Sequence, residues 1–204
     1  MTHHRITRNL VSIAASLGVL LVVAGCPQGS TGTQSKSPKK THKSEVAPIP
    51  TPPDVVDKML EMAGVTKDDV VWDLGCGDGR IVIAAAKKYG CKAAGFEIEP
   101  DLVAKSRENA RAAGVEELVT IEERDIFTLD LSEATVVTLY LLPQMNEKLV
   151  PQIEKMKPGS RVVAHDFGIK GYKPADVVRM ESTEDESRHA VLLYTTPLEK
   201  QLDE

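Results

Sequence analysis

Hydrophobic and polar positions follow two different periods along the chain, and these periods alternate. Short, almost wholly apolar runs are typical of buried parallel strands, whereas apolar residues three or four positions apart are typical of helices that cover a sheet. The apolar runs predict strands at residues 70–74, 92–97, 118–122, 135–140 and 161–165. The helical spacing predicts helices at residues 55–62, 80–89, 100–113 and 142–156. The last of these helices is expected to bury Leu142, Met145, Leu149, Ile153 and Met156.

Two further strands are expected near the C-terminus, at residues 176–181 and 188–195, with no helix between them. The preceding link, residues 166–174, is too short for a full helix. Strands separated by helices indicate a parallel sheet, and a closing pair without a helix indicates a hairpin-like edge. The sequence therefore predicts an α/β domain with a mostly parallel sheet and an antiparallel C-terminal edge pair.

The first 25 residues have the pattern of a targeting segment. Arg5 and Arg8 precede an apolar run at residues 10–23, and the run is shorter than the about 20 apolar residues that span a bilayer. The letters Val-Ala-Gly-Cys that end at Cys26 resemble a lipobox, the bacterial site at which the cysteine is lipidated. We expect membrane attachment through lipidated Cys26, with an uncleaved N-terminal anchor as the alternative.

Residues 26–47 are rich in Pro, Ser, Thr, Gly and Lys, and we expect them to be a disordered tether. Lysines close to an apolar segment oppose its export, so the side of the membrane on which the protein lies stays open. The folded domain is expected at residues 48–197, followed by a tail at residues 198–204.

Composition narrows the range of partners. The 204-residue chain carries a net charge of −5, which argues against a nucleic-acid backbone as the main partner. Its three cysteines are too few for a disulfide framework, and neither Cys76 nor Cys91 has other metal ligands near it in the sequence. We expect a monomer without a metal site.

A glycine-rich segment, Asp-Leu-Gly-Cys-Gly-Asp-Gly-Arg at residues 73–80, joins the first strand to the next helix. This order places backbone N–H groups at a helix N-terminus, where they can face a ligand, and glycine lets a cofactor approach the backbone. Arg80 stands where dinucleotide-binding loops need a small residue. The second strand ends in Glu97, whose carboxylate can accept hydrogen bonds from two ribose hydroxyls. A tight turn without a ligand is the alternative.

With Asp73 two residues before its first glycine, the segment resembles motif I of class I S-adenosylmethionine (SAM) methyltransferases. The resemblance implies a Rossmann-like, seven-stranded, mostly parallel sheet with helices on both faces, and SAM as the cofactor. It also implies that Asp125 accepts a hydrogen bond from the adenine amino group, that Ile126 offers its backbone and an apolar wall, and that Thr51 belongs to a segment that folds over the cofactor. The cofactor-binding candidates are Thr51, Asp73, Gly75, Cys76, Gly77, Asp78, Glu97, Asp125 and Ile126.

Within that class the chain resembles the small protein-lysine methyltransferases of the mitochondrial ATP synthase c-subunit type, through the Pro-Thr-Pro lead at residues 50–52, Tyr-Leu-Leu-Pro-Gln-Met at residues 140–145 and Lys-Pro-Gly-Ser at residues 157–160. Many amino-group methyltransferases carry Asp/Asn-Pro-Pro-Tyr after the fourth strand, and this chain does not. Lysine and small molecules both remain open as acceptors.

The resemblance makes Tyr140 the candidate for orienting an acceptor amine. His165 and Asp166, at the end of the fifth strand, are candidates for taking its proton or holding the substrate. Two alternatives stay open: a methyltransferase for a small or lipid acceptor at the membrane, and a lipoprotein that keeps the fold as a binding module without catalysis.

Overall fold

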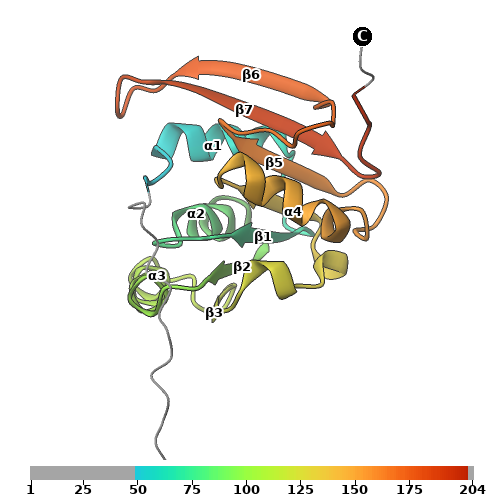
Figure 1. The fold of residues 1–204 in the computed structure, drawn as a ribbon. Coiled ribbons are helices and arrows are strands. Elements are labelled where there is room, and N and C mark those ends of the chain that lie inside the picture. Colours follow the sequence, from blue (N-terminus) through green and yellow to red (C-terminus); the bar gives the residue numbers. More distant parts are fainter. Residues whose placement is uncertain (1–48, 202–204) are drawn as a thin grey trace, which may run out of the picture. The chain divides into compact units, whose positions relative to one another are not determined.

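A seven-stranded sheet runs through residues 49–201, the part of the chain that this computed structural model describes (Figure 1). The strand order is β3-β2-β1-β4-β5-β7-β6. The first five strands in this order are parallel neighbours, whereas β7 runs antiparallel to both β5 and β6. The strands are β1 (Val70–Leu74), β2 (Lys92–Glu97), β3 (Val119–Glu123), β4 (Val136–Leu139), β5 (Arg161–His165), β6 (Asp176–Glu181) and β7 (Arg188–Thr195).

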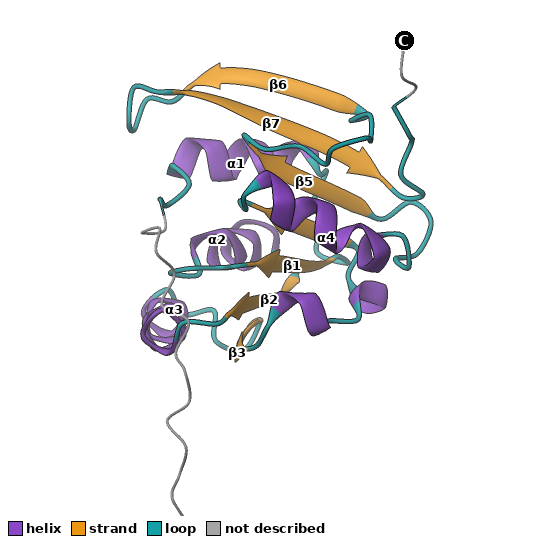
Figure 2. Cartoon of the chain, viewed as in Figure 1, coloured by secondary structure: helices purple, strands orange, loops and turns teal. Residues whose placement is uncertain are grey.

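Helices cover both faces of the sheet (Figure 2). One apolar cluster joins the first three helices to one face, and a second joins the fourth helix and two short 3-10 turns to the other. The helices are α1 (Pro53–Met62), α2 (Arg80–Tyr89), α3 (Pro100–Ala112) and α4 (Pro143–Ile153), and the 3-10 turns are η1 (Ile126–Thr128) and η2 (Leu131–Glu133).

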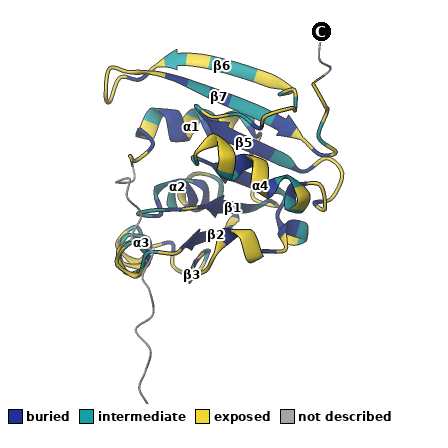
Figure 3. Cartoon of the chain, viewed as in Figure 1, coloured by how far each residue is buried: buried dark blue, intermediate teal, exposed yellow. Residues whose placement is uncertain are grey.

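Alternation along the strands builds these two cores. On β4, Val136 belongs to the cluster under α1–α3, and Val137 belongs to the cluster under α4. All four residues of β4 are buried, as the apolar run predicts for a central parallel strand. Its neighbour β5 is also mostly buried (Figure 3). Burial on both faces fixes the register of the central strands, because a slip of one residue would exchange the two sets of side chains.

The predicted fold class is confirmed, and most element boundaries agree within one residue. One expected core residue differs: Leu142 precedes α4 and is 43 % exposed. In the segment expected to be a tail, Lys200 forms a β-bridge with Tyr172.

The predictions for residues 1–25, Cys26 and the tether at residues 26–47 fall outside the described residues, and they stay predictions. Within residues 49–201, no helix has the length and hydropathy that crossing a membrane requires.

Truncation of Leu149 tests the packing of α4, since its side chain is fully buried in the cluster on that face. We expect Leu149→Ala to lower the free energy of unfolding by about 2–5 kcal/mol, through lost apolar contact and the cavity left behind. Urea denaturation measures this change. The matched control is Gln144→Ala at an exposed position of the same helix, which should stay within about 0.5 kcal/mol of the parent. Equal effects of the two variants would contradict this packing.

Candidate active site

The candidate site lies at the carboxyl ends of the parallel strands. The chain passes from β1 outward to β2 and β3, then returns to β4 on the other side of β1. The crevice at such a reversal is where open α/β sheets bind ligands. The segment at residues 73–80 follows β1 at this point, and Glu97 ends the neighbouring strand β2.

Backbone conformation explains the glycines of this loop. Gly75, Gly77 and Gly79 all have positive φ angles, of 80°, 54° and 81°. Other residues rarely adopt this conformation. A Cβ added to Gly79 would lie 2.9 Å from the Cβ of Ser106, so the third glycine also lets α3 pack against the loop. A Cβ added to Gly77 would meet nothing within 4 Å, which leaves open room beside the loop.

The Glu97 carboxylate connects β2 to the loop. Its Oε2 accepts a hydrogen bond from the backbone amide of Gly77 at 3.0 Å, and its Oε1 accepts bonds from the amides of Ile98 and Glu99 at 2.7 and 3.1 Å. Only 8 % of the residue is exposed. A buried carboxylate needs such donors, and these bonds fix its orientation beside the loop.

The expectation that the loop amides face a ligand is wrong for five of them, and two of these, on Gly79 and Arg80, bond within the loop itself, to the Cys76 carbonyl at 2.8 Å and to Asp78 Oδ1 at 3.2 Å. The amides of Gly75 and Cys76 donate to the carbonyl of Phe96 at 2.8 and 3.0 Å, and the amide of Gly77 donates to Glu97. The loop turns back over the end of β2, and groups of that strand accept the hydrogen bonds from these amides. Cys76 is buried beside Gly95, where an added Cβ would lie 2.7 Å from the Cys76 sulfur. Burial raises the pKa of the Cys76 thiol, so this side chain is a packing group.

Asp73 is the second buried acid at the loop. Its Oδ1 accepts a hydrogen bond from the Thr138 hydroxyl at 2.7 Å, and 3 % of the residue is exposed. Burial raises the pKa of Asp73 to about 7, and the nearby carboxylates of Glu97 and Asp78 also raise it, against the hydrogen bond from Thr138. A cation placed beside Asp73 would stabilise its ionised form.

Arg80, which the sequence marks only as a departure from dinucleotide-binding loops, joins the loop to the segment before α1. Its Nε and Nη2 donate to the two carboxylate oxygens of Asp78 at 3.0 and 2.8 Å, and its Nη1 donates to the carbonyl of Thr51 at 2.7 Å. These hydrogen bonds lower the pKa of Asp78. The lead segment is therefore held against the loop, and contact of Thr51 with a cofactor stays a prediction.

Asp125 and Ile126 follow β3. The Asp125 side chain is exposed, and its Oδ1 caps the turn by accepting from the amide of Phe127 at 2.9 Å. Ile126 is buried, and its carbonyl accepts from Gln152 Nε2 at 3.0 Å. Ile126 can still provide an apolar wall, but its carbonyl is engaged. Contact of both residues with adenine stays a prediction.

The three catalytic candidates are brought together at the ends of β4 and β5. The rings of Tyr140 and His165 stack with centroids 3.9 Å apart, and His165 Nδ1 lies 3.1 Å from the Thr51 hydroxyl. His165 is fully buried, and its Nε2 lies 2.9 Å from Nδ1 of His189. Both ring nitrogens of His165 therefore already have partners, whereas Asp166 is partly exposed.

Sequence reasoning did not find His189 or Asp185. His189 lies on β7, and its Nε2 is 3.2 Å from each carboxylate oxygen of Asp185. Burial lowers the pKa of His165, while hydrogen bonds from His189 to Asp185 and Asp166 raise the pKa of His189 against its own burial. No spacing signal could have linked them to His165, because only the antiparallel pairing of β5 with β7 brings them together.

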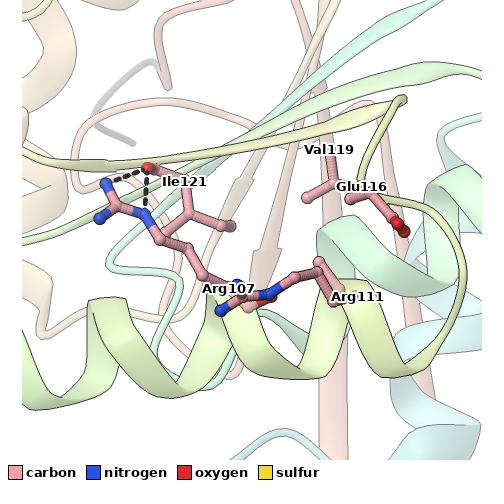
Figure 4. Close-up of a pocket in the computed structure, with 6 residues that line it drawn as sticks. Arg107, Arg111, Glu116, Val119 and Ile121 are labelled. Carbon is pink, nitrogen blue, oxygen red and sulfur yellow. Dashed lines mark hydrogen bonds between the residues drawn. The ribbon is translucent and has the colours of Figure 1, made fainter.

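Exposed apolar side chains also follow three of the strands. These are Ile98 after β2, Leu142 after β4 and Phe167 after β5. A hollow of about 240 Å³ lies elsewhere, between α3 and β3, where Arg107 bonds the carbonyl of Ile121 (Figure 4). That hollow does not include the glycine loop.

These features fit SAM. There is open room at Gly77, a buried carboxylate at the end of β2 that can take ribose hydroxyls, and a second buried carboxylate that favours a cation. A solved structure with 48 % sequence identity and a TM-score of 0.68, an RNA methyltransferase from Salinibacter ruber, contains S-adenosylhomocysteine; the alignment covers 76 % of this chain and 97 % of that one. Fold and site thus define a SAM-dependent methyltransferase.

Residues 73–176 match the ANTKMT methyltransferase domain, and the chain belongs to this family. It is 47 % identical over 148 residues to a protein-lysine N-methyltransferase of Saccharolobus islandicus, covering 72 % of this chain and 91 % of the relative. It is 34 % identical to the mouse lysine N-methyltransferase of the ATP synthase c-subunit, covering 62 % of this chain. The matched region spans about half the length of that vertebrate relative, 51 %.

The raised pKa of Asp73 predicts a pH-dependent cost to the cofactor-free fold. The pKa of Asp73 is about 7 in the folded state and 3.8 ordinarily, so between these pH values the folded state holds a proton that the unfolded state has lost. The free energy of unfolding therefore falls as the pH rises from 3.8 to about 7. At pH 8 we expect Asp73→Asn to raise the free energy of unfolding, measured by urea denaturation, by up to about 4 kcal/mol. This gain should be smaller at pH 5. The same variant should bind SAM more weakly.

The control for this prediction is Asp68→Asn, which makes the same charge change on an exposed side chain. It should show little gain at either pH. A wild-type protein as stable as Asp73→Asn at pH 8 would contradict the interpretation.

Proposed function

We propose that this methyltransferase transfers its methyl group to lysine side chains of proteins. The relative from Saccharolobus islandicus, which is named for this activity, matches over 91 % of its length, so the likeness extends well beyond the cofactor loop. The structural observation that carries the proposal is Tyr140. Within residues 49–201 its hydroxyl has no hydrogen-bond partner, and it lies just after β4 at the carboxyl edge of the sheet.

A lysine acceptor needs a neutral amine, because an ammonium group has no lone pair. SAM, when bound, supplies a methyl group on a sulfonium. The chain's own residues have to orient the amine, exclude water and allow a proton to leave. Burial and the nearby carboxylates of Asp166 and Asp185 raise the pKa of Tyr140, so its hydroxyl stays neutral and can hold the amine. The partly exposed carboxylate of Asp166 is a second group that an amine can approach.

Charge at the site favours a cationic acceptor over a polyanion. Asp125, Asp166 and Asp185 belong to the strand-end groups described above, the charge of Asp78 is balanced by Arg80, and the whole chain carries a net charge of −5. Negative potential attracts a lysine side chain and repels a phosphate backbone. This distinction matters because the Salinibacter ruber relative is named an RNA methyltransferase.

Methyl transfer from tritiated SAM to three defined mixtures tests the acceptor class. These are total cellular protein, the same protein after its lysines have been acetylated, and total RNA. We expect label in the first mixture only, recovered as methylated lysine after hydrolysis, because acetylation removes the nucleophilic amine. A lipid extract and a small-molecule fraction test the remaining acceptor classes. Label in RNA, lipid or small molecules but not in protein would overturn the proposal.

Tyr140→Phe removes one hydroxyl and keeps the ring that stacks on His165. If this hydroxyl orients the amine, kcat should fall by about tenfold or more while the affinity for SAM stays close to that of the parent. Steady-state methylation and calorimetric titration with SAM give the two numbers. Tyr172→Phe is the control, since its hydroxyl bonds Glu154 at a distant loop. An unchanged kcat for Tyr140→Phe would remove this residue from the site.

A further inference from the structure

Three potential metal-ligand atoms converge at the end of β5. His165 Nε2, His189 Nδ1 and Asp166 Oδ2 form a small triangle, with separations of 2.9 Å between the two nitrogens, 3.3 Å from His189 to Asp166, and 3.4 Å from His165 to Asp166. Both histidines are buried, and the aspartate is half-buried. Cysteine spacing alone suggested no metal site, and this cluster has no cysteine and comes from two separate strands.

The partners of the outer nitrogens direct lone pairs into this triangle. His189 Nε2 faces the Asp185 carboxylate, which accepts hydrogen bonds and does not donate them when ionised. In the metal-free protein Nδ1 of His189 can carry a proton toward His165 or Asp166; a metal ion would displace that proton, so that the remaining proton is on Nε2 and Nδ1 offers a lone pair. The Thr51 hydroxyl at 3.1 Å can accept from Nδ1 of His165, which leaves on Nε2 a lone pair that faces His189 in the metal-free protein and that a metal ion can take instead. A carboxylate–histidine pair behind a ligand is the usual outer support of a zinc site.

Asp166 is held for the same geometry by its backbone. Its φ angle is 58°, which is uncommon for a residue other than glycine. Its amide donates to the carbonyl of Ala190 at 2.7 Å, and its Oδ1 accepts from the amide of Ala190 at 2.8 Å. These two bonds attach Asp166 to β7 and direct its other oxygen, Oδ2, to the two histidines.

Two sides of the triangle, 3.3 and 3.4 Å, match a metal coordination sphere, and the two nitrogens, 2.9 Å apart, would have to separate slightly on binding. Zinc lies about 2.0–2.1 Å from nitrogen and oxygen ligands, so two ligands of a tetrahedral site are about 3.3–3.4 Å apart. A point at about this bond length from all three atoms exists slightly outside their plane. Two imidazoles and one carboxylate suit Zn²⁺, Co²⁺ or Fe²⁺, whereas Mg²⁺ and Ca²⁺ prefer oxygen ligands alone.

We propose that His165, His189 and Asp166 form a three-ligand site for a divalent transition-metal ion of the zinc class, with a fourth position open. Asp166 and His189 also line a hollow of about 440 Å³ at β6 and β7, which gives an ion a path to the cluster. Arg179, Arg188 and Glu181 line the same hollow, so the negative charge that attracts a cation comes from Asp166 and Glu181 in its lining and from Asp185 behind His189.

Such an ion would join the end of β5 to β7 and, through His165, to Thr51 and the stacked ring of Tyr140. In this site His165 and Asp166 act as ligands, so neither takes a substrate proton, and Asp166 can hold an acceptor amine only while the metal site is empty. The proposal rests on the ligand geometry and is independent of whether the methyl acceptor is lysine.

Titration of the chelator-treated full chain with Zn²⁺, and separately with Co²⁺, tests the site. We expect one tightly bound ion per chain and the visible absorption of a tetrahedral Co²⁺ complex. His189→Gln and Asp166→Asn should each weaken this binding by about 100-fold or more, because each removes one of three ligands. Asp185→Asn should weaken it by about 10–100-fold, as for other outer-shell carboxylates. Asp166→Asn keeps an oxygen for the Ala190 amide, so it preserves the local fold if His189→Gln does not.

His3, His4 and His42 can also hold metal ions, so a control variant carries Gln at these three positions. It should retain the tight site and the Co²⁺ spectrum. Tight binding that survives in Asp166→Asn and His189→Gln, or that disappears in the control, would overturn the proposal. So would the absence of tight binding to wild type, and the cluster would then be a hydrogen-bonded chain only. Circular dichroism of each variant shows that the fold is retained.

Discussion

The candidate site depends on one buried carboxylate, that of Glu97, and on the backbone amides that donate hydrogen bonds to it. Glu97 ends a parallel strand at the reversal point of the sheet, where it is 8 % exposed. An ionised carboxylate in such a place is tolerated only with donors around it. The amide of Gly77 is one of these donors, so the hydrogen bond that stabilises the Glu97 carboxylate also holds the glycine loop against β2. The same group then presents a fixed acceptor beside the open room at Gly77.

The second half of the site is connected to the first through Arg80. Its guanidinium bonds Asp78 in the loop and the carbonyl of Thr51 before α1. The Thr51 side chain in turn contacts His165 at the end of β5. A residue that excludes dinucleotide binding at the level of sequence therefore has a positive role: it connects the cofactor loop to the strands on which an acceptor would bind.

The sequence predicted the fold well because burial dominates in a parallel sheet. β1 and β5 have the predicted bounds, and the site residues Asp73 and His165 lie within the last two residues of these strands. Periodicity misplaced Leu142, because the helical spacing continues one residue before the helix starts, into an exposed position at the site. Periodicity also could not show that the amides of Gly75 and Cys76 donate to the carbonyl of Phe96. These hydrogen bonds depend on how the loop turns over β2. His189 was missed because strand pairing, and not sequence spacing, brings it to His165.

Calorimetric titration of S-adenosylhomocysteine into the wild-type chain and Glu97→Gln tests the central claim most directly, with Glu123→Gln as a control on the neighbouring edge strand. A glutamine has one acceptor oxygen and cannot serve the loop and two ribose hydroxyls together. The account predicts that Glu97→Gln stays folded and binds at least about tenfold more weakly, which is a loss of about 1.4 kcal/mol or more, while Glu123→Gln binds as wild type does. Equal affinity of Glu97→Gln and wild type would contradict it.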